Sequence, residues 1–334
     1  MTMPPWLHEL VNGHDFEVRD DIPRAPIAPT TSQAQTAAAF GFKWQQRESF
    51  ESETVLRLTR EYVAERYGPI ATADWWPEHG PNPLVIDAGC GAGLTALAML
   101  EPIFSRIHYL GIDISDAVDV AAQRLRDRGL PGAFIQADYT DVPLPDGIAA
   151  FVLAEGTLHH TDDTEHAFHR VARLVAPGGR FGFYVYRRKA PIREFTDDYI
   201  RGRLRTMTPE RAWEAMKPLT RLGIALGELG AEIDVPEDID LLGIPAGRHD
   251  VQRLFYYYVC KAYHRPEFTF EENNHLNYDW FAPANAHRHT EDELHAWCDE
   301  AGLTIEREVV QPSGITIVAR RDRRAPANVA PCAP

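Results

Sequence analysis

The sequence predicts an α/β protein with a mostly parallel sheet, and two observations carry that prediction. Between residues 84 and 186, short apolar runs alternate with amphipathic segments, and glycine-containing turns separate them. Strands that alternate with helices in this way form βαβ units, whose strands lie parallel in one sheet. The chain has 334 residues, of which 44% are hydrophobic and 25% charged, as expected for a soluble protein with a sizeable core.

The stretch from residue 84 to residue 186 predicts five strands and three helices. We expect the strands at residues 84–89, 107–115, 133–139, 147–156 and 180–186. Each is a short apolar run bounded by turn residues, which is typical of a buried strand. The helices are expected at residues 94–100, 117–129 and 162–179.

The segments on either side follow different patterns. Residues 1–35 show little periodicity and are rich in proline and threonine, so we expect an extended arm. The aromatic patch "FGFKW" (residues 40–44) follows, either as a cover for a bound ligand or as a packing contact. A polar helix is then expected over about residues 51–67.

After residue 186 the alternation stops. Helices are expected at residues 192–204, 209–229 and 251–264, over a stretch too long to be a loop. A helix and two strands then restore the sheet pattern at residues 290–302, 303–311 and 314–321. The helical block is therefore expected to be an insertion between late strands, used as a lid or a substrate-binding subdomain.

Composition argues against several classes of partner. The net charge of −15 disfavours a nucleic acid, which would need a surplus of Lys and Arg on one face. No apolar run reaches the roughly 18 residues that a membrane helix needs. The N-terminus has no charged start with an apolar core, so we expect no signal peptide. The cysteines are far apart and without CxxC spacing, as expected for free thiols in a reducing cytoplasm: Cys90, Cys260, Cys298 and Cys332.

The segment "VIDAGCGAG" (Val85–Gly93) carries the clearest functional signal. Its three glycines follow a strand and open a helix, where backbone amides can bind a nucleotide-like ligand. A dinucleotide fingerprint would need glycine where the chain has Leu94, and the Gly-Lys-Ser/Thr of a P-loop does not follow. Asp87 stands two residues before the first glycine. A carboxylate there suits a cationic amino-acid headgroup better than a pyrophosphate.

This segment and four others resemble the S-adenosylmethionine-dependent methyltransferases with a seven-stranded sheet. "VIDAGCGAG" is similar to their first motif. Four further segments are similar to later strands and turns of that family: "YLGIDIS", "IQADYTDVPLP", "FVLAEGTLHHTDD" and "VARLVAPGGRFGFYVY". The resemblance covers residues 84–186 and, less closely, 290–320. It implies a Rossmann-like, mostly parallel seven-stranded sheet with helices on both faces.

The resemblance also implies the cofactor and its contacts. S-adenosyl-L-methionine would be the methyl donor and S-adenosyl-L-homocysteine the product. Asp113 would accept hydrogen bonds from the ribose hydroxyls, Asp138 would meet the adenine amino group, and Tyr139 would flank the adenine ring. The full set of expected cofactor-binding residues is Asp87, Gly89, Cys90, Gly91, Gly93, Asp113, Ile114, Asp138, Tyr139 and Glu155.

The catalytic residues are harder to predict. Methyl transfer from a sulfonium needs mainly positioning and exclusion of water, and a base only where the acceptor must lose a proton. The candidates are Glu155, His159 and Tyr186. Glu155 is either a base or a contact to the methionine ammonium. His159 is either a participant in catalysis or a packing histidine.

The densest polar and aromatic stretch is "NHLNYDWFAPANAHRH" (residues 274–289). A substrate-binding rim is expected there and at the end of the fifth strand, formed by Arg187, Tyr257, His275, Asn277, Asp279, His287 and His289. A metal site with Asp279 as carboxylate ligand is the sharper alternative. The spacing of His287 and His289 matches no firm metal signature, so we expect no metal.

These observations divide the chain into an N-terminal arm and cofactor cover (1–50), a cofactor-binding core (51–189), a helical insertion (190–280), the C-terminal part of the sheet (281–322) and a disordered tail (323–334). The expected function is methyl transfer to a small molecule, such as a natural-product or envelope-sugar intermediate. The alternatives are a non-methylating S-adenosylmethionine-binding protein and an NAD-dependent oxidoreductase. We expect a cytoplasmic protein with no nucleic-acid or membrane partner, and a homodimer formed through the insertion.

Overall fold

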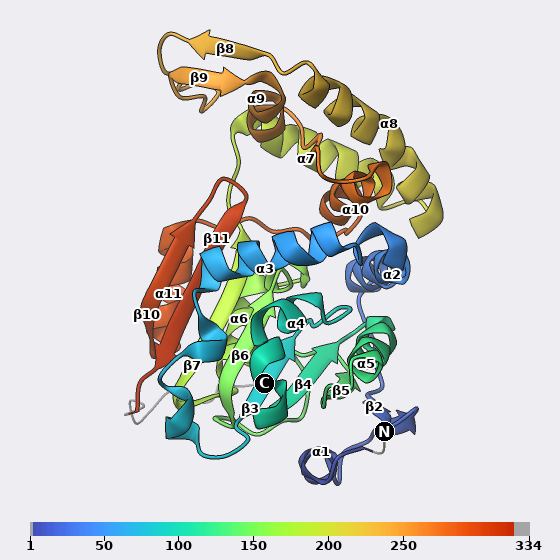
Figure 1. Ribbon diagram of the computed structural model, residues 1–334, viewed down its shortest axis with the longest axis vertical. Coiled ribbons are helices and arrows are strands. Elements are labelled where there is room, and N and C mark those ends of the chain that lie inside the picture. Colours follow the sequence, from blue (N-terminus) through green and yellow to red (C-terminus); the bar gives the residue numbers. More distant parts are fainter. Residues whose placement is uncertain (1–2, 324–334) are drawn as a thin grey trace.

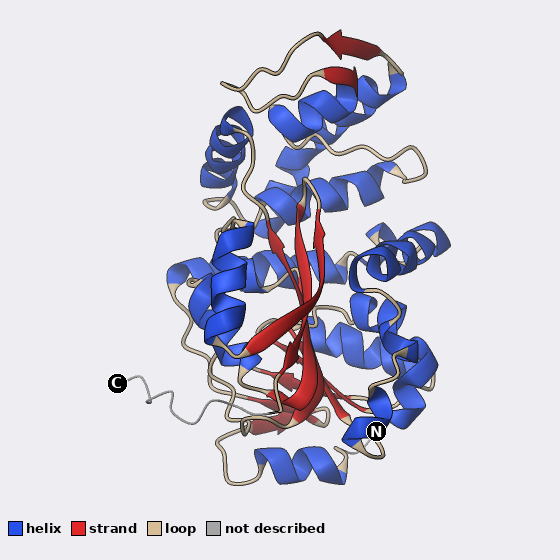
Figure 2. Cartoon of the chain, turned by 90° about the vertical axis from the view of Figure 1, so that its left-hand side faces the viewer, coloured by secondary structure: helices blue, strands red, loops and turns tan. Residues whose placement is uncertain are grey.

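A nine-stranded sheet runs through the centre of the protein (Figures 1 and 2). The computed structural model describes residues 3–323. Five neighbouring strands run parallel: β3 (Leu84–Ala88), β4 (His108–Asp113), β5 (Ala133–Gln136), β6 (Ala149–Glu155) and β7 (Val175–Tyr186). Two antiparallel strands continue the sheet beyond β7, namely β11 (Gly314–Arg321) and β10 (Leu303–Val310). All seven strands that the sequence predicts are therefore present in one mostly parallel sheet.

The strand order places a switch point beside the first predicted strand. Along the sheet the order is β1-β2-β5-β4-β3-β6-β7-β11-β10, so β3 lies between β4 and β6. The chain leaves β3 toward one edge and later returns to its other side. In open α/β sheets, ligands bind outside the carboxyl ends of the strands at such a point.

Two hydrophobic cores cover the two faces of the sheet. Alternate strand residues point to opposite faces, so Val85 packs with one core and Ile86 with the other. The Val85 core includes buried residues of α3 (Glu53–Tyr67), α4 (Leu94–Leu100) and α5 (Ala117–Asp127). The Ile86 core includes buried residues of α1 (Pro5–Val11), α6 (Thr164–Ala172) and α11 (Glu291–Glu300). The five 3₁₀ helices among the described residues are η1 (Arg47–Ser49), η2 (Ile70–Thr72), η3 (Trp76–His79), η4 (Glu101–Arg106) and η5 (Leu158–His160).

Residues 3–35 do not form the extended arm that the sequence predicts. Helix α1 buries Leu7 and Val11 in the core beneath the sheet. The hairpin of β1 (Glu17–Arg19) and β2 (Ile22–Arg24) then extends the sheet, with Arg24 paired to Gln136 of β5. Strands of three residues and a helix of seven give too few repeats for a periodic pattern to show.

The aromatic patch at residues 40–44 lies in a helix. Helix α2 (Thr31–Gln45) begins at Thr30, whose hydroxyl accepts a hydrogen bond from the Gln33 N–H at 3.1 Å. It packs against α5 on one side and against α8 and α10 on the other. Its last turns thereby reach the carboxyl ends of the central strands (Figure 1).

The segment after β7 forms a helical layer beyond these strand ends (Figure 1). It comprises α7 (Pro191–Leu204), α8 (Pro209–Glu228), the hairpin of β8 (Glu232–Val235) and β9 (Gly247–Asp250), α9 (Val251–Tyr258) and α10 (Phe270–Phe281). The helix expected at residues 251–264 ends at Tyr258, and α10 and the hairpin were not predicted. None of the helices within residues 3–323 combines the length and the apolar character needed to cross a membrane.

The remaining predictions for the termini and thiols divide between described and undescribed residues. Cys90, Cys260 and Cys298 are buried free thiols, and Cys332 lies outside the described residues. The expected disordered tail at 323–334 also lies outside them, except for Arg323.

Candidate active site

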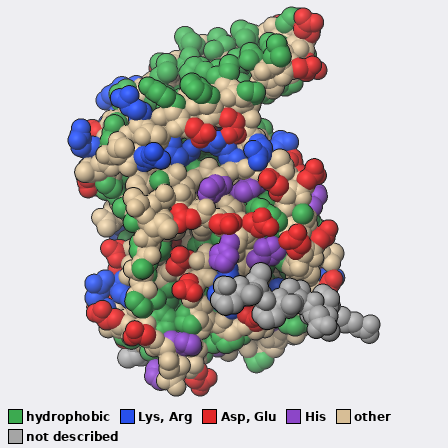
Figure 3. All heavy atoms as spheres, turned by 180° about the vertical axis from the view of Figure 1, so that it is seen from behind, with side chains coloured by type: hydrophobic (Ala, Val, Ile, Leu, Met, Phe, Trp, Pro, Cys, Tyr) green, Lys and Arg blue, Asp and Glu red, His purple; other side chains and the backbone are tan. Residues whose placement is uncertain are grey.

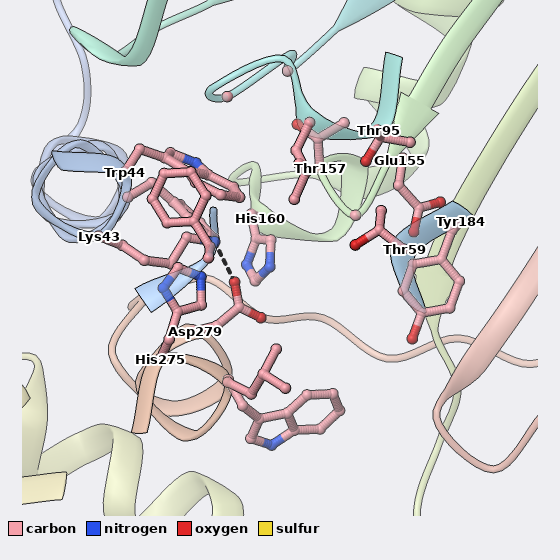
Figure 4. A pocket seen from close by; sticks show the side chains of 18 of the residues that line it. Lys43, Trp44, Thr59, Thr95, Glu155, Thr157, His160, Tyr184, His275 and Asp279 are labelled. Carbon is pink, nitrogen blue, oxygen red and sulfur yellow. Dashed lines mark hydrogen bonds and ion pairs between the residues drawn. The ribbon is translucent and has the colours of Figure 1, made fainter. Parts of the chain in front are cut away.

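A cavity of about 460 Å³ opens at the switch point of the sheet. Its walls come from the glycine turn after β3, the ends of β4, β6 and β7, and helices α2, α3 and α10. Figure 4 shows Trp44, Lys43 and Asp279 on one side of this space and Glu155, Thr59 and Tyr184 on the other. Residues that are far apart in the sequence therefore share one enclosure.

The glycine turn is closely packed on both sides. Gly89 and Gly91 adopt φ angles of +76° and +49°, in the left-handed region that favours glycine. A Cβ at Gly89 would lie 2.0 Å from Oγ1 of Thr157, and one at Gly91 would lie 2.7 Å from Nε1 of Trp44. Both glycines line the cavity, whereas Gly93 caps the start of α4 behind it. The turn therefore leaves no room for side chains between the strand end and its neighbours.

Two carboxylates beside this turn have no cationic partner. Asp87 is 3% exposed and accepts a hydrogen bond from Oη of Tyr109 at 2.8 Å. Asp113 is half-buried and accepts from the N–H of Gly91 at 2.8 Å and from Ser115 N and Oγ at 2.9 and 2.7 Å. Neither forms an ion pair with any described residue. Burial raises the pKa of Asp87 to about 7, and desolvation also raises the pKa of Asp113.

Glu155 ends β6 and faces the cavity through a cluster of donors. Its carboxylate accepts hydrogen bonds from the hydroxyls of Tyr67 and Tyr62, the latter at 3.1 Å. Nη1 of Arg66 lies 3.9 Å from it. Burial raises the pKa of Glu155, although Arg66 and the two tyrosines oppose that shift. Two tyrosines and an arginine therefore hold the carboxylate in place.

The other predicted cofactor contacts divide into two groups. Cys90, Ile114 and Tyr139 line the cavity, and the Tyr139 hydroxyl accepts a hydrogen bond from Thr157 Oγ1 at 3.1 Å. Asp138 does not line it. Its carboxylate accepts hydrogen bonds from N and Oγ1 of Thr140 at 2.9 and 2.7 Å. Asp138 therefore stabilises the turn after β5.

Helix α2 covers the glycine turn with a cation and an indole. Lys43 pairs with Asp279 of α10, and its ammonium lies 3.7 Å from the centroid of the Trp44 ring (Figure 4). Burial lowers the pKa of Lys43 against the opposing effect of Asp279. Burial alone would raise the pKa of Asp279, but Lys43 and Lys261 hold it well below its usual range. Phe40, Lys43 and Trp44 line the cavity, so the patch at residues 40–44 lies where a ligand cover would be.

The two adjacent histidines after β6 face different surroundings. His160 lines the cavity, and its Nδ1 lies 2.6 Å from the carbonyl oxygen of Asn285. His159, expected as a catalytic candidate, is fully buried outside the cavity lining, with its ring centroid 3.8 Å from that of Tyr186. The ring packs against Tyr184 and Tyr186 of β7, which is the position expected for the packing alternative, and a catalytic role for His159 stays a prediction. Burial lowers the pKa of His160 to about 4 and holds that of His159 well below its usual value.

The predicted substrate rim is only partly brought together. Tyr186, His275 and Asp279 line the cavity, and Nδ1 of His275 lies 2.8 Å from the Ser49 hydroxyl. Asn277 is buried in α10, where it bonds Tyr263 N at 2.8 Å. The residues expected at the rim but absent from the cavity lining are Asn277, Arg187, Tyr257, His287 and His289.

His287 and His289 lie in a separate hollow together with Arg188, Arg288 and Glu293. Asp279 is therefore not part of a ligand set with them, which removes the metal site considered for these three residues. The one group of three potential metal ligands among the described residues is Glu165, His169 and Glu300, away from both hollows.

Several lining residues were not singled out from the sequence, among them Lys43, Tyr256, Lys261 and Trp280. Lys261 lies in the segment between α9 and α10, which was expected to be helical. Tyr257 was expected at the substrate rim, but it is the neighbouring Tyr256 that lines the cavity. Nothing in the sequence pattern around Lys261 indicates that its side chain reaches the cavity.

Comparison with known proteins identifies the central part of the chain. Residues 86–183 match the family model described as a methyltransferase domain. These residues form an S-adenosylmethionine-dependent methyltransferase domain. An uncharacterized methyltransferase of Mycobacterium bovis is 35% identical over 103 residues, covering 30% of this chain and 50% of the relative. The 27-O-demethylrifamycin SV methyltransferase of Amycolatopsis mediterranei is 32% identical over 102 residues, covering 29% and 36%.

The similarity to these two relatives extends over 103 and 102 residues, which is less than a third of this chain. The chain spans about half the length of the mycobacterial relative that it matches. Among solved structures, the Burkholderia thailandensis 1,6-didemethyltoxoflavin-N1-methyltransferase, with S-adenosylhomocysteine bound, has a TM-score of 0.43 at 14% identity, covering 92% of this chain and 98% of that one.

The cavity of the methyltransferase domain suits its cofactor, S-adenosylmethionine. Asp87 and Asp113 are carboxylates without ion-pair partners, at the end of the sheet where ligands bind. A cationic ligand with an ammonium group and vicinal hydroxyls supplies the partners that these carboxylates lack. The two carboxylates therefore match the ammonium and hydroxyl donors of the cofactor.

Proposed function

We propose that this chain transfers a methyl group from S-adenosylmethionine to a small molecule held in the cavity between the sheet and helices α2 and α10. The observation that carries the proposal is the position of Asp87 and Asp113, unpaired at the switch point and on the wall of a cavity that continues to Tyr186 and Trp280. The cavity thus has an acidic end for the cofactor and an aromatic end for an acceptor.

The cofactor, when bound, supplies a methyl group on an electrophilic sulfonium. Asp87 holds the methionine ammonium, Asp113 accepts hydrogen bonds from the ribose hydroxyls, and Tyr139 flanks the adenine. Gly89 and Gly91 let the backbone of the turn lie close to Thr157 and Trp44, because any Cβ at these positions would meet those side chains. Asp138 does not line the cavity, so in this proposal it acts indirectly, by stabilising the backbone turn that follows Tyr139.

Helices α2 and α10 cover this space and would limit the access of water once the cofactor is bound. Lys43 and Asp279 bridge the two helices, and Trp44 closes the gap above Gly91. Displacement at a sulfonium depends on positioning and on a dry site more than on acid–base groups. The bridge therefore contributes to the reaction by holding the cover in place.

Glu155 and Tyr186 are the two remaining catalytic candidates on the cavity wall. The hydrogen bonds from Tyr62 and Tyr67 to Glu155 favour an orienting role near the methyl group over that of a base. Burial raises the pKa of Tyr186 well above its usual range, so its hydroxyl stays protonated and can donate a hydrogen bond to the acceptor.

Partners and location form the rest of the proposal. The acceptor belongs to natural-product or envelope-sugar metabolism, and the rifamycin-methylating relative supports the first of these. The net charge of −15 disfavours nucleic acid, and buried free thiols suit a cytoplasmic protein. A homodimer through the insertion is supported by its exposed apolar side chains: Phe195, Tyr199, Leu222, Leu229, Ile233, Ile239 and Leu241. Figure 3 shows that hydrophobic side chains gather at the upper end of the molecule. Analytical ultracentrifugation tests that assembly.

Calorimetric titration with S-adenosylhomocysteine and with NAD tests the cofactor part of the function. We expect saturable one-to-one binding of S-adenosylhomocysteine and no heat from NAD at the same concentrations. Binding of NAD alone would favour the oxidoreductase alternative and remove this proposal.

Labelled S-adenosylmethionine incubated with the protein and small-molecule extracts tests the transfer itself. We expect the label in a low-molecular-weight product when wild-type protein is used, and none when the Asp113→Ala variant replaces it. Cofactor binding without transfer to any extract would instead favour the non-methylating alternative.

A further inference from the structure

We propose that the acceptor is a planar aromatic acid and that Lys261 is the counter-ion of its anionic oxygen group. This inference rests on the proposed function and names the substrate class of the same cavity. Four observations carry it: an unpaired buried ammonium, the pairing of the neighbouring cations, an aromatic wall, and an acidic opposite end.

The ammonium of Lys261 is buried on the cavity wall without a carboxylate partner. The residue is 7% exposed and lines the cavity. Its Nζ donates one hydrogen bond, to the carbonyl oxygen of Leu276 at 2.8 Å, and lies 4.6 Å from the centroid of the Trp280 ring. It forms no ion pair with any described residue. An ammonium has three donors, and a buried charge without a counter-ion is costly, so a bound anion would satisfy Lys261.

The neighbouring cations already have their partners. Lys43 pairs with Asp279, and Nε of Arg193 lies 2.8 Å from Oδ1 of Asp197. Lys189, on the same indole, donates to the carbonyl oxygens of Pro312 and Ser313 at 2.7 Å each. Of the cations that lie over Trp280, Lys261 is therefore the one that faces the cavity with donors to spare.

The histidines on the cavity wall do not compete for an anion. Burial lowers the pKa of His160 to about 4 and that of His275 to about 3, so both rings are neutral near pH 7. Asp279 forms its ion pair with Lys43, and it acts on Lys261 only through the longer-range attraction that helps to lower the pKa of Asp279. Among the described Lys and Arg residues that line the cavity, Lys261 is therefore the one without an ion-paired carboxylate.

An aromatic wall surrounds the ammonium. The rings of Tyr186 and Trp280 lie 4.1 Å apart between centroids at an angle of 31°, and Tyr256 and Tyr263 continue the lining. Flat aromatic surfaces favour a flat ring, through offset or edge-to-face contacts. An acidic substituent on that ring would reach Lys261 beside Trp280.

The opposite end of the cavity fixes the direction of binding. Asp87, Asp113 and Glu155 line the cofactor end, and their carboxylates would repel the acidic group of the acceptor. The acidic group of the acceptor therefore points to Lys261, and the nucleophilic atom on the far side of its ring points toward the sulfonium. A sugar without an acidic group would leave the ammonium of Lys261 without a counter-ion.

Two matched probes test the inference: 2-naphthoate and its neutral analogue 2-naphthamide, titrated into the wild-type protein saturated with S-adenosylhomocysteine at pH 6. We expect naphthoate to bind at least about tenfold more tightly than naphthamide, as a charge-assisted contact predicts. In Lys261→Met the preference should fall below about twofold, and Lys261→Arg should retain most of it. Lys217→Met removes a lysine of the same subdomain that pairs with Glu214 outside the cavity, and it should behave like the wild type.

Equal affinity for the two probes, binding of neither, or a preference that survives Lys261→Met would overturn the inference. If Lys261→Met does not fold, wild-type protein with ¹³C-methylated lysines gives the same decision by NMR. The pKa of Lys261 must rise when naphthoate binds and stay unchanged with naphthamide, and no rise with naphthoate would be contrary. The affinity of each protein for S-adenosylhomocysteine is measured separately. If the wild-type protein does not bind S-adenosylhomocysteine, the proposed function is removed, and this result is distinct from a missing preference for naphthoate.

Discussion

The indole of Trp44 lies directly against Gly91, whose φ angle is +49°. A helix that precedes the cofactor-binding core in sequence thus covers the motif by which that core is identified. The contact joins the N-terminal segment to the cofactor end of the cavity, and five expected outcomes follow from it and from the charged groups around it.

Gly91→Ala should weaken binding of S-adenosylhomocysteine at least about tenfold and lower the free energy of unfolding by about 1–3 kcal/mol, because the new methyl group meets Trp44 and the backbone is strained. Gly129→Ala is the matched control, since Gly129 also has a positive φ, +64°, but has nothing within 4 Å of its added Cβ. It reports strain alone. Calorimetry and urea denaturation measure both effects, and equal losses in the two variants would show that the Trp44 contact is unimportant.

Asp87→Asn should stabilise the ligand-free protein at pH 8 by about 1–4 kcal/mol while weakening cofactor binding. The folded pKa of Asp87, about 7, lies above its ordinary value of 3.8. Its stabilising contribution is therefore complete below pH 4 and is lost as the pH rises through 7, where the buried group must ionise. In urea denaturation, the free energy of unfolding should decrease less between pH 5 and pH 8 for the variant than for the wild type.

Cofactor binding should release close to one proton near pH 6. The methionine ammonium favours the ionised form of Asp87, which is largely protonated in the ligand-free protein at that pH. Titrations of S-adenosylhomocysteine in buffers of different ionisation enthalpy count the protons. The release should disappear in Asp87→Asn, and an unchanged count in that variant would assign the proton to another group.

Asp113→Ala should weaken binding of S-adenosylhomocysteine by about 1–3 kcal/mol, which is the typical effect of deleting a charged hydrogen-bond partner. The exposed Asp141 serves as the control, and Asp141→Ala should bind like the wild type. Calorimetry decides the comparison. Unchanged affinity in Asp113→Ala would mean that the ribose hydroxyls lie elsewhere.

Lys43→Met should lower the free energy of unfolding by about 1–3 kcal/mol, because it leaves Asp279 without its cation in a half-buried position. Adding Asp279→Asn should recover part of the loss, since the pair acts as a unit. Thermal or urea denaturation of the two single variants and the double variant measures the coupling. Additive losses would show that the bridge contributes little.

The sequence predicts the parts of the site that local structure alone positions. Asp87, Gly89 and Gly91 follow one strand, and Asp113 ends the next, so the parallel sheet brings them together whatever surrounds it. The same holds for the seven strands of the main sheet, each of which carries its own apolar run and turn signal.

The remainder depends on tertiary packing that no local pattern encodes. Lys43 and Lys261 reach the cavity because α2 and the segment after α9 fold over the strand ends. Which of His159 and His160 faces inward depends on one turn of a 3₁₀ helix. Helix α10 was missed because asparagine and histidine have low helix propensity. Here Asn273 and Asn277 bond the backbone of Arg265 and Tyr263 beside the helix, which explains their place in it.

The β1–β2 hairpin has a consequence for how ligands exchange. It ties residue 24 to the sheet edge at Gln136, while η1 and α3 hold the chain just after residue 45. The segment that carries Trp44 is thus tethered at both ends, like a strap rather than a free flap. We therefore expect that a spent cofactor leaves when α2 (Thr31–Gln45) pivots about the segments that join it to β2 and η1, without any strand of the sheet separating.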